Sequence, residues 1–124
     1  MSNEKPEVDF PAGEPPADLQ VTDVWEGDGP EAKAGDTVSV HYVGVAFSTG
    51  EEFDASWNRG SAFQFPLGKG RVIAGWDRGV AGMKVGGRRR LTIPAGLAYG
   101  NQSPTPAIKP GETLIFVVDL LGVS

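Results

Sequence analysis

The sequence predicts an α+β domain in which about five strands, joined mainly by hairpins, lie against one short helix. Runs of alternating apolar and polar residues mark the strands, and short stretches rich in glycine, proline and aspartate separate them. Residues 72–80 carry apolar side chains at helical spacing. This helix has to cover the concave face of a twisted antiparallel sheet, because no other element can.

The strands follow one another along most of the chain. Residues 19–25 alternate weakly, whereas residues 37–47 alternate clearly, with Val38, Val40 and Tyr42 on one face. Further strands are expected over residues 52–56, 63–67, 88–93 and 112–123. The last of these is apolar on both faces, which is typical of a central strand.

The stretch 72–80 is the element around which the rest is organised. Ile73, Trp76 and Val80 fall at i, i+3 and i+7, so they share one helical face. The run is only about two to three turns long and contains poor helix formers, so it needs a sheet to lie on. Its tryptophan is therefore expected at the bottom of an apolar pocket.

The composition excludes several classes of protein. The chain has 124 residues, no cysteine, one histidine and a formal net charge of −5. The absence of cysteine excludes disulfides and cysteine-based metal sites, and we expect neither a metal nor a cofactor. The acidic charge argues against non-specific nucleic-acid binding. With no signal peptide and no apolar stretch of the roughly 20 residues that a membrane helix needs, a soluble cytoplasmic protein is expected.

Residues 1–18 differ in composition from the rest of the chain. They are acidic and rich in proline, and such segments bury too little apolar surface to fold by themselves. We therefore expect a flexible arm ahead of one domain over residues 19–124. Phe10 is the one arm residue that could dock on that domain, and a partner-binding arm is the alternative.

No pattern indicates a nucleotide-binding or hydrolytic site. The glycine-rich stretch 68–71 does not match a phosphate-binding loop. His41 points away from Tyr42 in an extended strand, so it is expected to be a sheet-face residue without a catalytic role. Three serines lack a convincing base: Ser56, Ser61 and Ser103. The basic run 88–90 is expected to form a solvated edge.

Aromatic residues are concentrated at positions beside the expected helix. They are Tyr42, Phe53, Phe63, Phe65, Trp76, Tyr99 and Phe116. Core packing accounts for most of them, but Tyr42, Trp76 and Tyr99 carry polar atoms that need partners when buried. Asp54 lies in the same region, and Arg59 and the Tyr42 hydroxyl are its expected partners. Such an aromatic cup indicates a site for a compact apolar ligand.

The order of motifs resembles that of the FKBP-type peptidyl-prolyl cis-trans isomerases, the macrolide-binding immunophilins. The matching motifs, between about residues 19 and 123, include Val40-His-Tyr-Val-Gly44, Phe53-Asp-Ala-Ser56, Val72-Ile-Ala-Gly-Trp76, Ala98-Tyr-Gly100 and Glu112-Thr-Leu-Ile-Phe116. The resemblance implies a half-barrel sheet of five or six antiparallel strands wrapped around one short helix.

The resemblance also implies a pocket between helix and sheet with Trp76 as its floor. The implied catalytic residues are Tyr42, Asp54, Trp76, Tyr99 and Phe116. The implied substrate- and inhibitor-binding residues are Phe53, Arg59, Phe63, Val72, Ile73 and Ile108. The Ile73 backbone N–H and the Tyr99 hydroxyl would donate hydrogen bonds to ligand carbonyls. Arg71 replaces an acidic or amide residue common in the family, with little effect expected because the family uses mainly the backbone there.

The implied activity is cis-trans isomerisation of Xaa-Pro bonds during protein folding, by a monomer without a cofactor. The implied partners are proline-containing polypeptides and macrolide inhibitors of the FK506/rapamycin type, with neither nucleic acid nor membrane involved. One alternative is a proline- or macrolide-binding module with little turnover, and another is a structural domain whose aromatics are only core. The presence of Asp54, Tyr99 and Phe116 beside Trp76 favours the enzyme.

Overall fold

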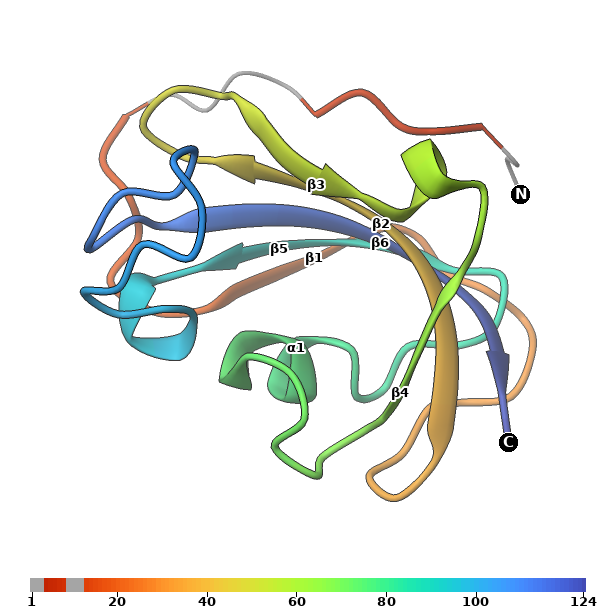
Figure 1. Ribbon diagram of the computed structural model, residues 1–124. Coiled ribbons are helices and arrows are strands. Elements are labelled where there is room, and N and C mark those ends of the chain that lie inside the picture. The colour runs from red at the N-terminus through yellow and green to blue at the C-terminus, as the bar shows by residue number, and fades with distance from the viewer. Residues whose placement is uncertain (1–3, 9–12) are drawn as a thin grey trace.

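In the part of the chain that the structure describes, six antiparallel strands form one sheet that curves around a single short helix (Figure 1). The computed structural model describes residues 4–8 and 13–124, so Phe10 lies outside the described residues. The strands are β1 (Gln20–Trp25), β2 (Thr37–Ala46), β3 (Glu52–Ala55), β4 (Phe63–Pro66), β5 (Arg88–Ile93) and β6 (Leu114–Val123). The helix is α1 (Ala74–Gly79), and η1 (Ser56–Arg59) and η2 (Ala95–Leu97) are 3₁₀ turns. The predicted α+β architecture is confirmed.

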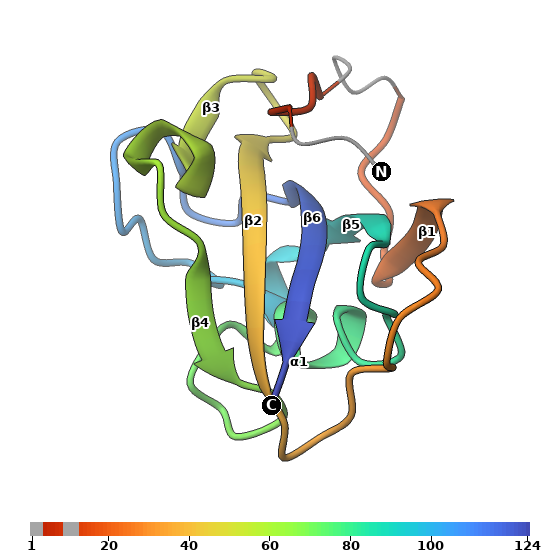
Figure 2. The same ribbon diagram turned by 90° about the vertical axis from the view of Figure 1, so that its right-hand side faces the viewer.

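The two longest strands lie side by side in the middle of the sheet. The strand order is β1-β5-β6-β2-β3, and β4 pairs with the other part of β2. In Figure 2, β4, β2, β6, β5 and β1 follow one another from left to right. Every residue of β6 from Leu114 to Leu120 is buried, as predicted for a central strand. The sheet therefore has an apolar cluster on each of its faces.

The helix is shorter than the predicted stretch 72–80. Val72 and Ile73 precede it, and Ile73 has a ψ of 148°, outside the helical range. Trp76 and Val80 nevertheless lie in the main core cluster, 4% and 0% exposed. In the part of the chain that the structure describes, no helix is long and apolar enough to cross a membrane.

Two glycines allow α1 to lie directly on the sheet. A Cβ atom built on Gly75 would lie 2.5 Å from Cγ2 of Ile93, and one on Gly79 would lie 2.7 Å from Cδ2 of Leu91. Both distances are shorter than van der Waals contact. The residues that make this helix weak in isolation therefore permit its close packing on β5.

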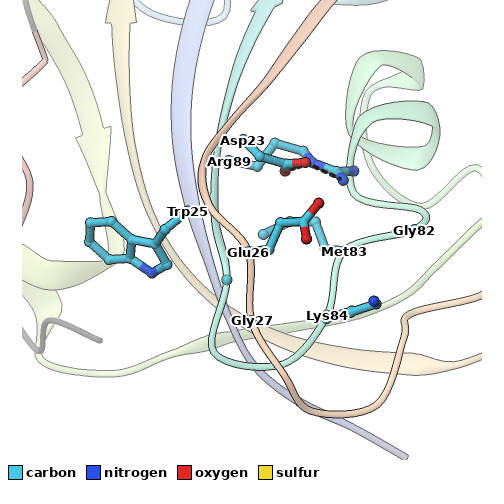
Figure 3. Close-up of a pocket in the computed structure, with 9 residues that line it drawn as sticks. Asp23, Trp25, Glu26, Gly27, Gly82, Met83, Lys84 and Arg89 are labelled. Carbon is cyan, nitrogen blue, oxygen red and sulfur yellow. Dashed lines mark hydrogen bonds and ion pairs between the residues drawn. The ribbon is translucent and has the colours of Figure 1, made fainter.

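The arginine run 88–90 does not lie at a solvated edge, so that prediction is wrong. It forms half of β5, which lies between β1 and β6. Arg88 is 8% exposed and donates from Nε and Nη2 to the carboxylate of Asp119 at 2.9 and 2.8 Å. Arg89 pairs with Asp23 of β1 at 2.7 Å, beside a cavity of about 30 Å³ (Figure 3). That cavity is large enough for little more than a water molecule.

Candidate active site

An open cavity of about 230 Å³ lies between α1 and the concave face of the sheet. Residues from β2, β3, β4, α1 and β6 and from two loops line it. They are Tyr42, Phe53, Asp54, Phe63, Arg71, Val72, Ile73, Trp76, Tyr99 and Phe116. The cavity is smaller than the roughly 300–1,000 Å³ typical of drug-sized ligands, so it suits a compact group or one part of a larger ligand.

The indole of Trp76 is held edge to face by neighbouring rings. Its centroid lies 4.9 Å from that of Tyr42 and 5.2 Å from that of Phe116, with interplanar angles of 80° and 88°. Phe63 and Phe65 contact the same indole at 6.0 and 5.5 Å. Such edge-to-face pairs are a favourable arrangement of aromatic rings. The indole is therefore fixed before any ligand enters.

A β-bulge brings two neighbouring residues of β3 to the cavity. Neighbours in a regular strand point to opposite faces, so Phe53 and Asp54 would not share one site. The register between β2 and β3 shifts here: Asp54 lies opposite Gly44, and Glu52 lies opposite Val45. Phe53 is the extra residue of the bulge. Both Phe53 and Asp54 consequently line the cavity.

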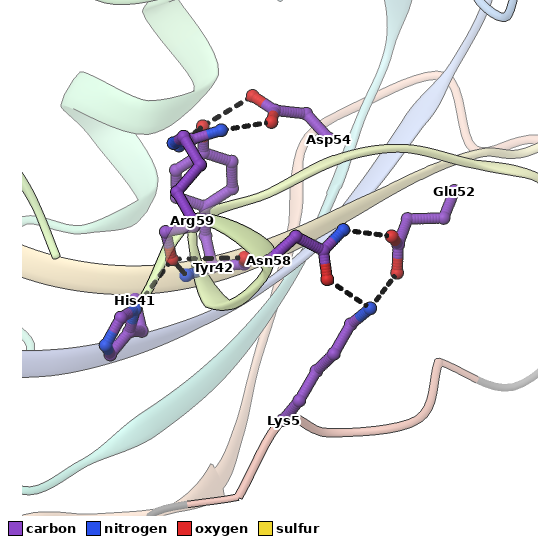
Figure 4. A network of polar contacts seen from close by, with 8 residues as sticks. Lys5, His41, Tyr42, Glu52, Asp54, Asn58 and Arg59 are labelled. Carbon is purple, nitrogen blue, oxygen red and sulfur yellow. Dashed lines mark hydrogen bonds and ion pairs between the residues drawn. The ribbon is translucent and has the colours of Figure 1, made fainter. Parts of the chain in front are cut away.

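Three side chains form a closed hydrogen-bonded network at the rim (Figure 4). The Tyr42 hydroxyl donates to Oδ2 of Asp54 at 2.5 Å. Arg59 donates from Nη1 to Oδ1 of Asp54 at 2.6 Å and from Nη2 to the Tyr42 hydroxyl at 2.9 Å. The partners expected for Asp54 are thus confirmed. Arg59 itself reaches the cavity only through the other two residues.

The network shifts the ionisation of its members. Burial would raise the pKa of Asp54, but hydrogen bonds from Tyr42 and Arg59 outweigh it and hold that pKa below its ordinary value. Burial, followed by the hydrogen bond to Asp54, raises the pKa of Tyr42. Because the pKa of Asp54 is lower in the folded state, its contribution to stability is present above the unfolded pKa and is lost as pH falls through the folded value.

Several hydrogen-bond donors at the cavity make no hydrogen bond to residues 4–8 and 13–124, the buried Nε1 of Trp76 among them. Two others are the backbone N–H of Ile73 and the hydroxyl of Tyr99. Tyr99 is 37% exposed, and burial, followed by the charge of Asp54, raises its pKa. The hydroxyl is therefore protonated at neutral pH and available to a ligand.

One residue expected in the wall of the cavity differs from the sequence-based expectation. Ile108, expected in the wall, is 2% exposed and lies in the main core cluster rather than in the lining. Ile108 lies in a turn in which its backbone N–H donates to the carbonyl of Thr105 at 3.1 Å. Arg71 lines the cavity and makes no ion pair within the described ranges; the small effect expected of this residue stays a prediction.

The histidine and a neighbouring serine belong to the scaffold. Ser56 is 0% exposed, accepts a hydrogen bond from the Tyr42 N–H at 2.7 Å, and lies 2.8 Å from Nδ1 of His41. The His41 ring stacks on Trp57 at 4.2 Å. A fully buried hydroxyl cannot reach a substrate, so this pair fixes η1 to β2. No group of three acidic or histidine side chains able to hold a metal ion occurs in the described residues.

The chain is similar to several known proteins. Residues 29–121 match the family described as FKBP-type peptidyl-prolyl cis-trans isomerase. An "FK506-binding protein" of Streptomyces anulatus is 73% identical, covering 99% of this chain and 100% of that protein. "Peptidyl-prolyl cis-trans isomerase FPR2" of Saccharomyces cerevisiae is 50% identical over 75% of this chain and 69% of its own length. The crystal structure of FkpA from Escherichia coli superposes with a TM-score of 0.76 at 42% identity, over 86% of this chain and 48% of FkpA.

Proposed function

Because this chain belongs to the FKBP-type peptidyl-prolyl cis-trans isomerase family and is therefore a prolyl isomerase, we propose that the cavity beside α1 is its active site. This proposal rests mainly on one observation: a preformed aromatic cavity is lined by donors without protein partners in the described residues, among them the Ile73 N–H and the Tyr99 hydroxyl. The proposed catalytic residues are Tyr42, Asp54, Trp76, Tyr99 and Phe116. The proposed binding residues are Phe53, Arg59, Phe63, Val72 and Ile73, with Ile108 supporting them from the core.

The reaction needs no nucleophile, because rotation about a peptide bond breaks no covalent bond. Its barrier of ~18–20 kcal/mol reflects lost amide resonance. The planar amide is the more dipolar form, so water stabilises it more than the twisted form. An aromatic cavity that excludes water removes this advantage, and the twisted transition state is then bound in preference to the planar ground state.

Two of the unpartnered donors would hold the peptide in a productive orientation. In this proposal, the Ile73 N–H and the Tyr99 hydroxyl bind carbonyl groups on either side of the proline ring. The ring itself lies on the Trp76 indole. Fixing both flanks restricts the peptide to a turn-like conformation in which rotation is easier. The Asp54 network keeps Tyr42 in place as part of the wall.

We propose that the substrates are Xaa-Pro segments of unfolded or flexible polypeptides and that the role is in protein folding. Macrolides of the FK506/rapamycin type would compete for the same cavity, in keeping with the name of the Streptomyces relative. The protein would act as a cytoplasmic monomer without nucleic acid or membrane. Residues 19–124 form the proposed isomerase domain, and residues 1–18 form an arm attached to it.

The experiment is an NMR exchange assay on a Xaa-Pro tetrapeptide. Trp76→Phe and Tyr99→Phe are expected to lower kcat/KM. Tyr99→Phe removes one hydrogen bond, which corresponds to a decrease in kcat/KM of about threefold to tenfold. Trp25→Phe is the matched control, because Trp25 lies at the end of β1 and does not line the cavity. Unchanged rates in both cavity variants would exclude this cavity as the active site.

A further inference from the structure

The sheet buries apolar side chains on the face that points away from α1. Val43, Val45, Ala55 and Ile115 are all between 0% and 4% exposed there. In the described part of the chain, α1 is the only α-helix, and it lies on the opposite face (Figure 1). The partly buried residues that pack on this cluster are Val8, Phe47 and Trp57. The N-terminal segment 4–8 thus supplies part of the cover.

Lys5 anchors this segment to two different elements. Its Nζ lies 2.8 Å from Oε1 of Glu52 on β3 and donates to Oδ1 of Asn58 on η1 at 3.0 Å. Asn58 in turn donates from Nδ2 to Oε2 of Glu52 at 3.0 Å, which closes a triangle (Figure 4). Burial alone would raise the pKa of Glu52, but the hydrogen bonds from Lys5 and Asn58 lower it below its ordinary value. The carboxylate therefore stays charged and paired at neutral pH.

The backbone of the same segment has a second anchor. Nη2 of Arg88 donates to the carbonyl of Glu4 at 3.1 Å, while the same guanidinium pairs with Asp119. Arg88 is buried within the sheet, so this donor is fixed in space. Segment 4–8 is consequently held at its start by β5 and at Lys5 by β3 and η1. We call it the N-terminal strap.

The strap joins the same two elements that the rim network joins from the other side. On the outer face, Lys5 connects Glu52 of β3 with Asn58 of η1. At the cavity, Arg59 of η1 is paired with Asp54 of β3 at 2.6 Å. The bulge at Phe53 separates the two carboxylates onto opposite sides of the strand. Each contact therefore restricts the movement that would break the other.

The 3₁₀ turn that carries Arg59 depends on such external contacts. η1 has four residues and no side-chain cap at its start. Short 3₁₀ turns have poor hydrogen-bond geometry, so their position is determined largely by what they contact. The Lys5–Asn58 bond and the stacking of Trp57 on His41 are two of these contacts. Removing the first would leave Arg59 with more conformational freedom.

We propose that Lys5 is a positioning residue for the active site, because it ties η1 to β3 and thereby keeps Arg59 against Asp54 and Tyr42. Its effect on catalysis rests on the proposed function of the cavity. Its effect on the rim network does not, and can be measured in the free protein. The strap, which belongs to the N-terminal arm, would then contribute to the active site of the isomerase domain.

The test compares Lys5→Ala with the conservative Lys5→Arg and with Lys33→Ala, which removes an exposed lysine that makes no ion pair among the residues described. The pKa of Asp54 is measured by NMR titration. It is expected to rise toward its ordinary value in Lys5→Ala, to return in Lys5→Arg and to stay unchanged in Lys33→Ala. An unchanged pKa in Lys5→Ala would overturn the proposal, even if the melting temperature falls.

Two additions remove the remaining ambiguity. Lys5→Ala also removes a charge, so a neutral variant is needed as a second test. Asn58→Ala is expected to shift the pKa of Asp54 in the same direction. If the pKa shifts in Lys5→Ala alone, the cause is the loss of charge, and the proposal is overturned.

In the exchange assay, Lys5→Ala is expected to raise KM about twofold to fivefold with kcat retained, the range for an exposed ion pair. If the pKa of Asp54 shifts but KM does not change, Lys5 still positions the network of Tyr42, Asp54 and Arg59. In that case the proposed role of this network in catalysis is contradicted.

Discussion

At the scale of single residues, the need of a partly buried carboxylate for hydrogen-bond donors predicted its partners correctly. The sequence positions of loop residues did not predict where their side chains lie. A carboxylate beside an apolar cluster requires hydrogen-bond donors, and Asp54 has the two that were expected, Tyr42 and Arg59. Ile108 and Arg71 lie in loops, where no periodicity fixes the direction of a side chain. The structure buries the first in the core and places the second at the cavity.

The charge of Arg71 leads to a prediction about substrate choice. Asp54 is neutralised by Arg59, and Arg71 makes no ion pair with any residue that the structure describes, so Arg71 presents its positive charge to whatever enters the cavity. Arg71→Glu is expected to lower kcat/KM for a peptide with glutamate before proline about twofold to fivefold, to raise it for lysine, and to leave an alanine peptide unchanged. The measurement is the exchange assay at low and high salt, since screening should reduce the difference.

The matched control for this prediction is Arg78→Glu. Arg78 is an exposed residue of α1 with the same charge, and it does not line the cavity. If both variants shift the preference equally, the effect belongs to net charge and Arg71 has no specific role.

At the scale of elements, α1 shows how tertiary contacts override local propensity. A six-residue helix with glycine at its second and last positions would not form in isolation. It is stable here because it lies on β5 at a distance that only glycine permits. The same contact fixes the depth of Trp76 and therefore the floor of the cavity.

Gly79→Ala distinguishes the effect of helix propensity from the effect of packing against β5. Helix propensity alone would make the alanine variant more stable by about 1 kcal/mol. The new Cβ, however, would lie 2.7 Å from Cδ2 of the fully buried Leu91, and such overpacking costs about 1–3 kcal/mol. We expect a net loss of stability on the order of 1 kcal/mol, measured by urea denaturation.

Gly96→Ala is the control for this helix variant. A Cβ atom at Gly96 would meet no atom within 4 Å, so this substitution is expected to leave stability unchanged or slightly higher. Stabilisation by Gly79→Ala would show that the helix moves freely away from β5, contrary to the packing described.

At the scale of the whole molecule, the buried pair Arg88–Asp119 connects parts that are far apart in the chain. It joins β5 to β6, and the guanidinium lies 4.4 Å from the ring centroid of Trp25 on β1. The same group holds the carbonyl of Glu4 in the N-terminal strap. Three strands and the N-terminal segment therefore meet at one charged residue on the face opposite α1.

Asp119→Ala is expected to destabilise the protein strongly, because it leaves the buried guanidinium of Arg88 without its counter-charge. The loss expected for breaking a buried pair is about 3–5 kcal/mol. Asp23→Ala breaks the pair with Arg89, which is more exposed because the Asp23 side chain is 36% exposed. This substitution is expected to cost about 1 kcal/mol or less of stability. Denaturant midpoints of both variants check this, and equal losses would contradict the special position of Arg88.

The sequence by itself determined an α+β domain of five or six antiparallel strands around one short helix, the family and the aromatic residues beside the helix. These depend on alternation within single strands and on motifs of a few residues, which local chemistry specifies. Only the tertiary structure decided that Val72 and Ile73 precede the helix, that a bulge turns Phe53 and Asp54 to one side, and that Arg88 is buried. It also decided that Lys5 reaches Glu52. Each of these depends on contacts between segments distant in the chain, and no local pattern encodes the distance between them.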